Sequence, residues 1–270
     1  MKGSYRFRAF ALSLMLVVSP ILLEAYGTTK ALKIVLVSGS NEYFSALSLA
    51  KLKKHLEENY KKIHCTILQA RGKLNEKDEY SDLPGLEALN DCDVALFFTR
   101  RLTIDGEQLE RVKSYVNSGR PLVALRTASH GFQNWLEFDR LVLGGNYQGH
   151  YPGNPERSAI DVNGNRFPKG QTEGPTLEVR INKDAKNHPI LDGIGDFRSR
   201  YSLYKTSPVA PGVEVLMTGA IPGEKPEPLA WTRSYKGARI CYIALGGLQD
   251  FENPTFLRLV ANALLWAGGR

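Results

Sequence analysis

Short apolar runs alternate along the first half of the chain with segments of helical periodicity. We expect β-strands at residues 33–38, 63–68, 94–98 and 122–125, because each run is short, apolar and bounded by turn-forming or polar residues. Between the first two runs, residues 44–60 carry leucines on one face of a helix, with lysines and glutamates opposite. This alternation predicts an α/β protein with an open, mostly parallel sheet and helices on both faces.

A second helix is predicted between the third and fourth strands. Asp105 can cap its N-terminus, and Gln108 follows three residues later, as in a capping box. Gly119 supplies a C-terminal turn, and Pro121 prevents the helix from continuing.

The second half of the chain carries further strand patterns and one last helix. Lys236-Gly237 is a plausible hairpin turn between two of these strands. Asn253 and Pro254 form an N-cap and first-turn pair that begins the final helix, which ends near Gly268. The predicted strands lie at residues 177–181, 214–218, 229–234 and 239–245.

Residues 144–174 differ from the rest of the chain. They are rich in Gly, Pro and Asn and show little apolar periodicity. A structureless stretch of this length inside a compact domain is uncommon and is usually functional. We therefore expect a Gly-rich insertion that serves as a functional loop or a lid.

The N-terminal residues have the layout of a secretory signal peptide. Residues 1–8 carry three basic side chains and no acid, residues 9–23 are mainly apolar, and small residues flank Tyr26. We expect cleavage after Gly27, which leaves one domain over residues 28–270 in the periplasm or outside the cell. An uncleaved anchor is the alternative, although the apolar run is shorter than the roughly 20 residues that span a bilayer. No stable membrane span is expected after cleavage.

Composition excludes several classes of partner. The net charge of +7 is modest for 270 residues, and basic and acidic residues alternate along the predicted helices. Without an arginine stripe, a basic tail or a nucleic-acid motif, nucleic-acid binding is not expected. The sequence leaves a homo-oligomer open. The three cysteines, Cys65, Cys92 and Cys241, lack metal-knuckle spacing and are interpreted as small buried hydrophobic residues.

The predicted fold indicates where chemistry is to be expected. In open parallel sheets, ligands bind beyond the carboxyl ends of the strands, near a switch in strand order. Three polar strand exits satisfy this rule, at residues 39–43, 99–101 and 126–130. We expect them to converge at one rim of the sheet, covered by the insertion around His150.

Three residues at these exits are the candidate catalytic groups. The guanidinium of Arg126 suits a carboxylate, a phosphate or a pair of sugar hydroxyls, or it pairs structurally with an acid such as Glu42. His130 is a candidate general base or metal ligand, or its ring is satisfied by loop carbonyls. Glu42 or His150 is expected to assist His130. Ser129 is not expected to be a nucleophile, because the segment lacks the G-x-S-x-G pattern.

A metal site is kept only as an alternative. His130 and His150 supply two ligands, whereas a catalytic zinc normally has three protein ligands, so no metal or other cofactor is expected. The remaining polar and aromatic side chains near the rim are candidate substrate contacts. They are Tyr43, Arg100, Arg101, Thr127, Ser129, Tyr147 and His150.

Six stretches along the chain follow the order and spacing of one protein family. They are SGSNEY at 38–43, PLVALRTASHGF at 121–132, LGGNYQGH at 143–150, HPILDGI at 188–194, LAWTRSYKGARICYIALGGLQDF at 229–251, and the last helix at 253–267. Together they resemble the ThuA-like (trehalose utilisation) proteins of the class I glutamine amidotransferase-like superfamily. The resemblance implies a flavodoxin-like sheet and a small-molecule sugar or glycoside as the partner.

Two departures from the family pattern bear on the chemistry. Where the resemblance implies cysteine or histidine at a strand exit, this chain has Arg126. Where it implies histidine after the last strand, this chain has Gly247. A cysteine-dependent amidotransferase is therefore not expected. Three functions stay open: an enzyme acting on a sugar or glycoside, a non-catalytic carbohydrate-binding or partner module, and a metal-dependent hydrolase or isomerase that uses His130 and His150.

Overall fold

The computed structural model describes residues 1, 30–77, 79–152 and 173–270, and residues 31–270 form one structural unit. The predicted signal peptide lies outside the described residues apart from Met1. The predicted Gly-rich insertion is described only over residues 144–152 and at its last two residues. Within the described part of the chain, no helix is long and apolar enough to cross a bilayer.

Nine strands of the described residues form a single sheet in the order β2-β1-β3-β4-β9-β8-β7-β5-β6. The first five strands in that order are parallel. Their order, with β1 between β2 and β3, is one of the two common orders of doubly wound sheets. They are β2 (Ile63–Gln69), β1 (Leu32–Gly39), β3 (Val94–Thr99), β4 (Leu122–Leu125) and β9 (Ala238–Ile243).

The other half of the sheet is antiparallel, so the sheet is mixed rather than mostly parallel. The predicted hairpin at Lys236-Gly237 is present, and it reverses the chain direction between β8 and β9. The following pairs, β8 with β7, β7 with β5 and β5 with β6, are also antiparallel. These strands are β8 (Glu227–Tyr235), β7 (Glu214–Ala220), β5 (Glu173–Ile181) and β6 (Phe197–Tyr201), of which β6 has no counterpart in the sequence prediction.

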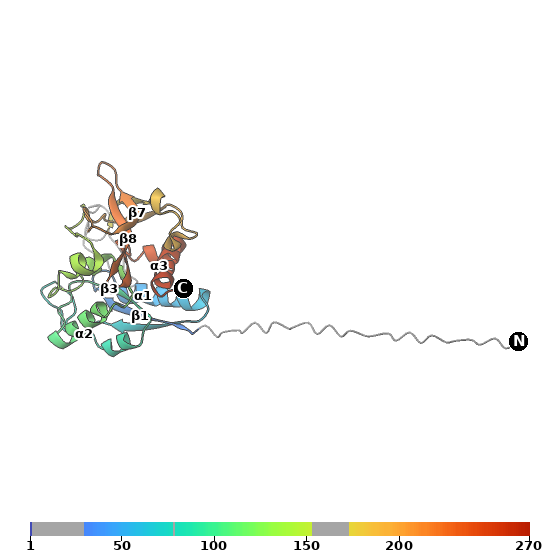
Figure 1. Cartoon of the computed structure of the whole chain (residues 1–270). Coiled ribbons are helices and arrows are strands. Elements are labelled where there is room, and N and C mark those ends of the chain that lie inside the picture. Colours follow the sequence, from blue (N-terminus) through green and yellow to red (C-terminus); the bar gives the residue numbers. More distant parts are fainter. Residues whose placement is uncertain (2–29, 78, 153–172) are drawn as a thin grey trace. The chain divides into compact units, whose positions relative to one another are not determined.

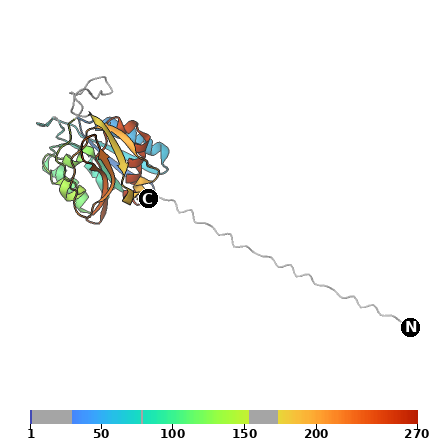
Figure 2. The same ribbon diagram turned by 90° about the horizontal axis from the view of Figure 1, so that it is seen from above.

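The predicted helices form and cover both faces of the sheet (Figures 1 and 2). Helices α1 (Ser45–Asn59) and α3 (Pro254–Ala267) contact each other on one face. On the other face, α2 (Gly106–Asn117) packs against the short helix η1 (Leu86–Asn90). The Asp105 side chain accepts a hydrogen bond from the Gln108 amide at 2.7 Å, which confirms the predicted cap. Asn253 caps α3 in the same way, through the Thr255 amide.

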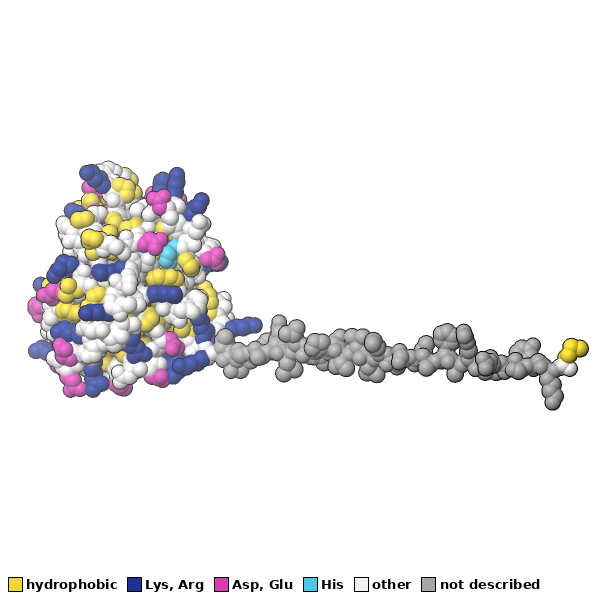
Figure 3. All heavy atoms as spheres, in the orientation of Figure 1, with side chains coloured by type: hydrophobic (Ala, Val, Ile, Leu, Met, Phe, Trp, Pro, Cys, Tyr) yellow, Lys and Arg dark blue, Asp and Glu magenta, His cyan; other side chains and the backbone are white. Residues whose placement is uncertain are grey.

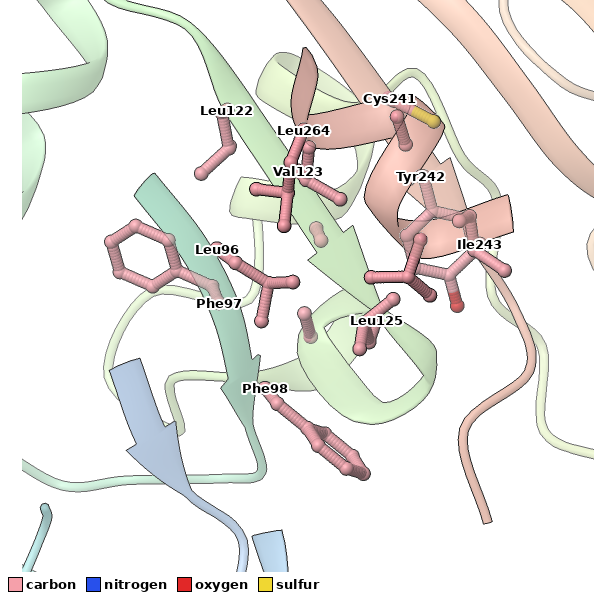
Figure 4. Packing of buried hydrophobic residues seen from close by; sticks show 14 of the residues in the cluster. Leu96, Phe97, Phe98, Leu122, Val123, Leu125, Cys241, Tyr242, Ile243 and Leu264 are labelled. Atoms are coloured by element: carbon pink, nitrogen blue, oxygen red, sulfur yellow. The ribbon is translucent and has the colours of Figure 1, made fainter. Parts of the chain in front are cut away.

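The hydrophobic core lies on both sides of the parallel strands. All residues of β3 and β4 are buried, as expected for central strands covered on both faces. Figure 4 shows Leu96 and Val123 of these strands packing near Leu264 of α3 and Ile243 of β9. The three cysteines are buried and unpaired, as predicted, and burial raises the pKa of the Cys65 thiol to about 12. A thiol in that environment is unreactive at neutral pH.

Candidate functional site

The exits of β1, β3 and β4 adjoin one another at the carboxyl edge of the parallel half-sheet. The Arg100 amide donates to the Gly39 carbonyl at 2.8 Å, which ties the β3 exit to β1. The Arg101 amide donates to the His130 carbonyl at 2.7 Å, which ties the β3 exit to the segment after β4. The predicted convergence of these segments is therefore present, at the switch point between β1 and β3.

Arg126 sits in a sharp turn that directly follows β4. Its φ of 41° lies in the left-handed region, which is costly for a residue with a side chain. The Tyr242 hydroxyl donates to the Arg126 carbonyl at 2.6 Å and so fixes the turn from β9. A strained strand-to-helix turn of this kind carries the nucleophile in elbow-type enzymes, but here it directs an arginine side chain into the protein.

The Arg126 guanidinium is fully buried in a cage of tyrosine rings. Its centre lies 4.9, 5.4 and 4.4 Å from the ring centroids of Tyr43, Tyr201 and Tyr204. Its nitrogens donate to the Tyr43 hydroxyl at 3.3 Å and to the Ser202 hydroxyl at 3.1 Å. The nearby tyrosine hydroxyls hold the pKa of Arg126 above its ordinary value even though burial acts to lower it. Arg126 therefore positions the tyrosines and has no exposed surface for a ligand in this arrangement.

A buried carboxylate, Asp250, lies near the guanidinium of Arg126. It accepts hydrogen bonds from the Gly246 and Gly247 amides at 3.0 and 2.8 Å and from the Ser199 hydroxyl at 2.8 Å. Burial raises the pKa of Asp250, and these hydrogen bonds and the charge of Arg126 oppose the rise. Asp250 thus connects the loop after β9 to the edge strand β6. It also supplies a buried negative charge near Arg126.

Arg100 lies between two carboxylates at the β1 and β3 exits. Its guanidinium is 2.6 Å from Glu42 and 3.2 Å from Glu79. Glu79 has no exposed surface and accepts the amides of Asn41 and Glu42 at 2.7 and 3.3 Å. Burial raises the pKa of Glu79 to about 7, against the opposing effect of the backbone hydrogen bonds and Arg100. The pair of Glu42 and Arg100 is held in place by this buried acid.

His130 lies at the meeting point of the three exits and keeps 6% of its surface exposed. Its ring stacks on Tyr147, with 4.3 Å between centroids and 18° between planes. Its Nδ1 is 3.1 Å from the Ser129 hydroxyl. Burial lowers the pKa of His130 well below its ordinary value, and the positive charges of Arg101, Arg100 and Arg126 lower it further. At neutral pH the imidazole is therefore uncharged and can accept a hydrogen bond, although the same surroundings make it a weaker base than a free imidazole.

The described part of the insertion approaches the same cluster. His150 pairs with Tyr204 in an isolated β-bridge, and their rings lie 6.3 Å apart. The Tyr204 ring also lies 6.1 Å from the His130 ring, so both histidines contact the same tyrosine region. His150 Nδ1 donates to the Tyr151 carbonyl at 2.8 Å. Among the residues that the structure describes, no three His, Cys, Asp or Glu side chains gather as metal ligands.

The other predicted contact residues differ in their exposure and in their hydrogen-bond partners. Arg101 is partly exposed and donates to the Gln133 side-chain oxygen at 2.9 Å. Thr127 is fully buried, and its hydroxyl has no partner within the described residues. Ser129 is buried, and its hydroxyl donates to the Arg126 carbonyl at 3.3 Å.

Sequence reasoning missed four residues of the site. Tyr201 is the last residue of β6, and Tyr204 follows the strand. β6 is only five residues long, and the alternation of its two arginines with other residues is a weak strand signal. Glu79 lies in a polar stretch without periodicity, so nothing marks it as a buried acid. Asp250 follows Gly246-Gly247 after the last strand, and the polar strand exit there was a signal that could have been used.

The fold and site define an α/β protein with a tyrosine-rich polar centre at the carboxyl edge of its parallel strands. The sequence matches the ThuA family, described as trehalose utilisation, over residues 34–267, and the chain belongs to that family. Among curated proteins, none matches the sequence.

Solved structures share the fold at low sequence identity. A ThuA-like protein from Parabacteroides merdae is 20% identical with a TM-score of 0.63, covering 89% of this chain and 91% of that one. A ThuA-like protein from Bacteroides uniformis is 17% identical with a TM-score of 0.61, covering 90% and 93%. A β-galactosidase from Rahnella sp. R3 is 14% identical with a TM-score of 0.53, covering 88% of this chain and 31% of that one.

Proposed function

We propose that the chain is an exported ThuA-like protein that binds a sugar or glycoside derivative at the carboxyl edge of β1, β3 and β4 and acts on it. The observation that carries the proposal is the state of His130. A neutral imidazole lies against Tyr147 at the point where three polar strand exits meet. A neutral histidine can accept a hydrogen bond from a bound hydroxyl, and it can take that proton when negative charge on the ligand offsets the nearby arginines.

Two observations support a carbohydrate ligand: the family description and the side chains at this edge of the sheet. The family description is trehalose utilisation, and one protein that shares the fold is a β-galactosidase. Aromatic rings with a polar edge, such as Tyr147, pack against apolar faces while their hydroxyls stay available for hydrogen bonding. Arg100 and Glu42 supply a donor and an acceptor at the same rim.

The roles of the three candidate catalytic residues follow from their surroundings. His130 is the proton-transferring group, and the Glu42–Arg100 pair orients hydroxyls beside it. Arg126 acts through the rings of Tyr43 and Tyr204 that it holds. A cysteine-dependent amidotransferase mechanism is not part of the proposal, because Arg126 occupies the turn after β4 and the cysteines are buried elsewhere.

A non-catalytic carbohydrate-binding module is the second candidate, and one observation favours it. The strained turn after β4, which in elbow-type enzymes presents a nucleophile, presents a buried arginine here. The strand order β2-β1-β3-β4-β9 supports a flavodoxin-like, class I glutamine amidotransferase-like ancestry for such a module. The metal-dependent alternative depends on His130 and His150 and needs a third ligand.

Calorimetric titration against a panel of mono- and disaccharides and glycosides, combined with product analysis, tests the proposal. We expect binding and turnover by the wild type, loss of turnover in His130→Asn, and no change in His64→Asn, a control on the exposed edge of β2. Binding without turnover supports the second candidate. Failure of the whole panel to bind contradicts both, and stoichiometric metal in the purified protein supports the metal-dependent alternative.

A further inference from the structure

We infer that the site takes an anionic sugar derivative, one that carries a carboxylate or a phosphate, and that Arg101 is the residue that contacts the anion. The inference rests on the proposed function and narrows its substrate class. It follows from the balance of charge around His130 and from the unusual backbone of Arg101.

Three guanidinium groups act on His130. Arg101, Arg100 and Arg126 each lower the pKa of the imidazole, and Arg101 has the largest effect among them. Arg101 and Arg100 act in the same direction on the pKa of the neighbouring Tyr147 hydroxyl. The rim around the two stacked rings therefore lies in a positive field, which attracts anions and raises their local concentration.

Two carboxylates of the site form ion pairs with Arg100, whereas the buried Asp139 accepts the Tyr147 amide at 2.8 Å. Glu42 and Glu79 both pair with Arg100, at 2.6 and 3.2 Å. The charge of the buried Asp250 acts to raise the pKa of Arg126.

Arg101 has a neutral partner, the Gln133 side-chain oxygen at 2.9 Å. Among the described residues, no carboxylate lies within ion-pair distance of Arg101. Of these three arginines, Arg101 is the one that is both partly exposed and without an ion pair to a described residue.

The backbone of Arg101 is fixed in a strained conformation beside His130. Its φ is 43°, in the left-handed region. Its amide donates to the His130 carbonyl at 2.7 Å, and its carbonyl accepts from the Asn75 side chain at 2.8 Å. Strain of this kind persists where surrounding contacts enforce it, and it concentrates at ligand-binding positions.

The side chain of Arg101 has the donors that an anion needs. A guanidinium carries five N–H groups, and the contact with Gln133 occupies Nη1. The group is partly exposed, unlike Arg126, so a ligand can reach it. Its fork matches the two oxygens of a carboxylate or a phosphate.

The test is calorimetric titration of the full-length mature protein with D-glucuronate, glucose 6-phosphate and D-glucose, and with the acid or phosphate form of any panel sugar that binds. We expect the anionic form to bind at least about 10-fold tighter than its neutral counterpart, with an advantage that shrinks as salt is added. The relative affinity of the carboxylate and phosphate forms identifies the source of the anion.

Variants assign the effect to one residue. Arg101→Gln should abolish the advantage of the anionic ligand, and Arg101→Lys should keep part of it. Arg111→Gln, an exposed arginine on α2 that pairs with Glu107, should keep all of it. Circular dichroism and thermal melting of each variant show that the fold is intact.

The outcomes separate this inference from the proposed function. Equal affinity for neutral and anionic forms overturns the inference and leaves the proposed function standing. An anionic advantage that survives in folded Arg101→Gln overturns the role of Arg101. If no panel sugar binds in either form, the proposed function fails, and this inference fails with it.

Discussion

The ring of Tyr201 lies directly against the backbone of Gly247. A Cβ added at Gly247 would be 1.8 Å from the nearest ring atom, which no packing arrangement permits. The same ring covers the Arg126 guanidinium. Arg126 and Gly247, the two positions where a departure from the family pattern is expected from the sequence, are therefore linked in the structure. Tyr201 fills the space that a side chain at residue 247 would need, and it packs on the arginine that follows β4.

Gly247→Ala should destabilise the protein. Forcing extra volume into a packed site costs about 1–3 kcal/mol, and we expect the upper end of that range because the ring contact is so close. Chemical denaturation measures the effect. Gly195→Ala is the matched control, since nothing lies within 4 Å of its added Cβ, and a change within about 0.5 kcal/mol is expected there. Equal stability for the two variants would contradict the close packing of Tyr201 on Gly247.

Arg126→Met should lower the free energy of unfolding by roughly 3 kcal/mol, because it leaves the Ser202 and Ala244 carbonyls buried without their donor and removes the positive charge that acts on Asp250. Arg126→Lys should recover only part of the loss, since an ammonium cannot reach Ser202 and Tyr43 together as the fork does. Urea titration provides the measurement, with the exposed Arg111→Met as control. A stability for Arg126→Met within 0.5 kcal/mol of the wild type (about the noise of surface changes) would show that the cage does not depend on the guanidinium.

Because of Glu79, the free energy of unfolding should fall as the pH rises from about 4.5 to about 7. Its pKa is about 7 in the folded protein against an ordinary value of 4.5. Within that window the folded state keeps a proton that the unfolded chain has released, so raising the pH favours unfolding. The free energy of unfolding of the wild type minus that of Glu79→Gln should fall through this pH window and stay constant above it.

The exposed Glu58→Gln variant controls for a general change in charge. If the difference in unfolding free energy between the wild type and Glu79→Gln does not vary with pH, Glu79 keeps its ordinary pKa in the folded protein.

Export should remove the first 27 residues. Expressed in a bacterium with a general secretory pathway, the chain should appear outside the cytoplasm with Thr28 as its N-terminus, which mass spectrometry of the intact protein reads directly. Replacing both Leu14 and Leu16 by Arg should retain the chain in the cytoplasm by interrupting the apolar run. A product that keeps Met1 and fractionates with the membrane would support the uncleaved anchor instead.

Local sequence signals predicted the parallel strands, the helix caps and one hairpin. The caps at Asp105 and Asn253 and the hairpin at Lys236-Gly237 are where the pattern put them, because each depends on residues close together in the chain. Charge is also distributed as expected: Figure 3 shows basic and acidic side chains interspersed over the described residues of that face. Of the antiparallel pairings, the sequence predicts only the hairpin between β8 and β9, and the pairing of β5 with β6 could not be derived because β6 is only five residues long.

The candidate site could be predicted only in outline. The rule for strand exits located His130 and Arg100 correctly at one rim, because the strand order determines which ends meet. The rule gives no information on burial, so Arg126 was expected to face a ligand and instead lies inside the tyrosine cage. Glu79 and Asp250 reach the site from loops distant in sequence, and no local pattern marks a carboxylate that is buried by tertiary packing.

A structure of the protein with the tightest-binding saccharide of the panel tests the central claim most directly. The account predicts that the ligand lies beyond the ends of β1, β3 and β4, with a hydroxyl in hydrogen-bonding distance of His130 and other polar groups on Arg100 or Arg101. A ligand bound elsewhere, for example in the groove between η1 and α2 that is lined by Leu86, Glu107 and Arg111, with His130 untouched, would contradict it.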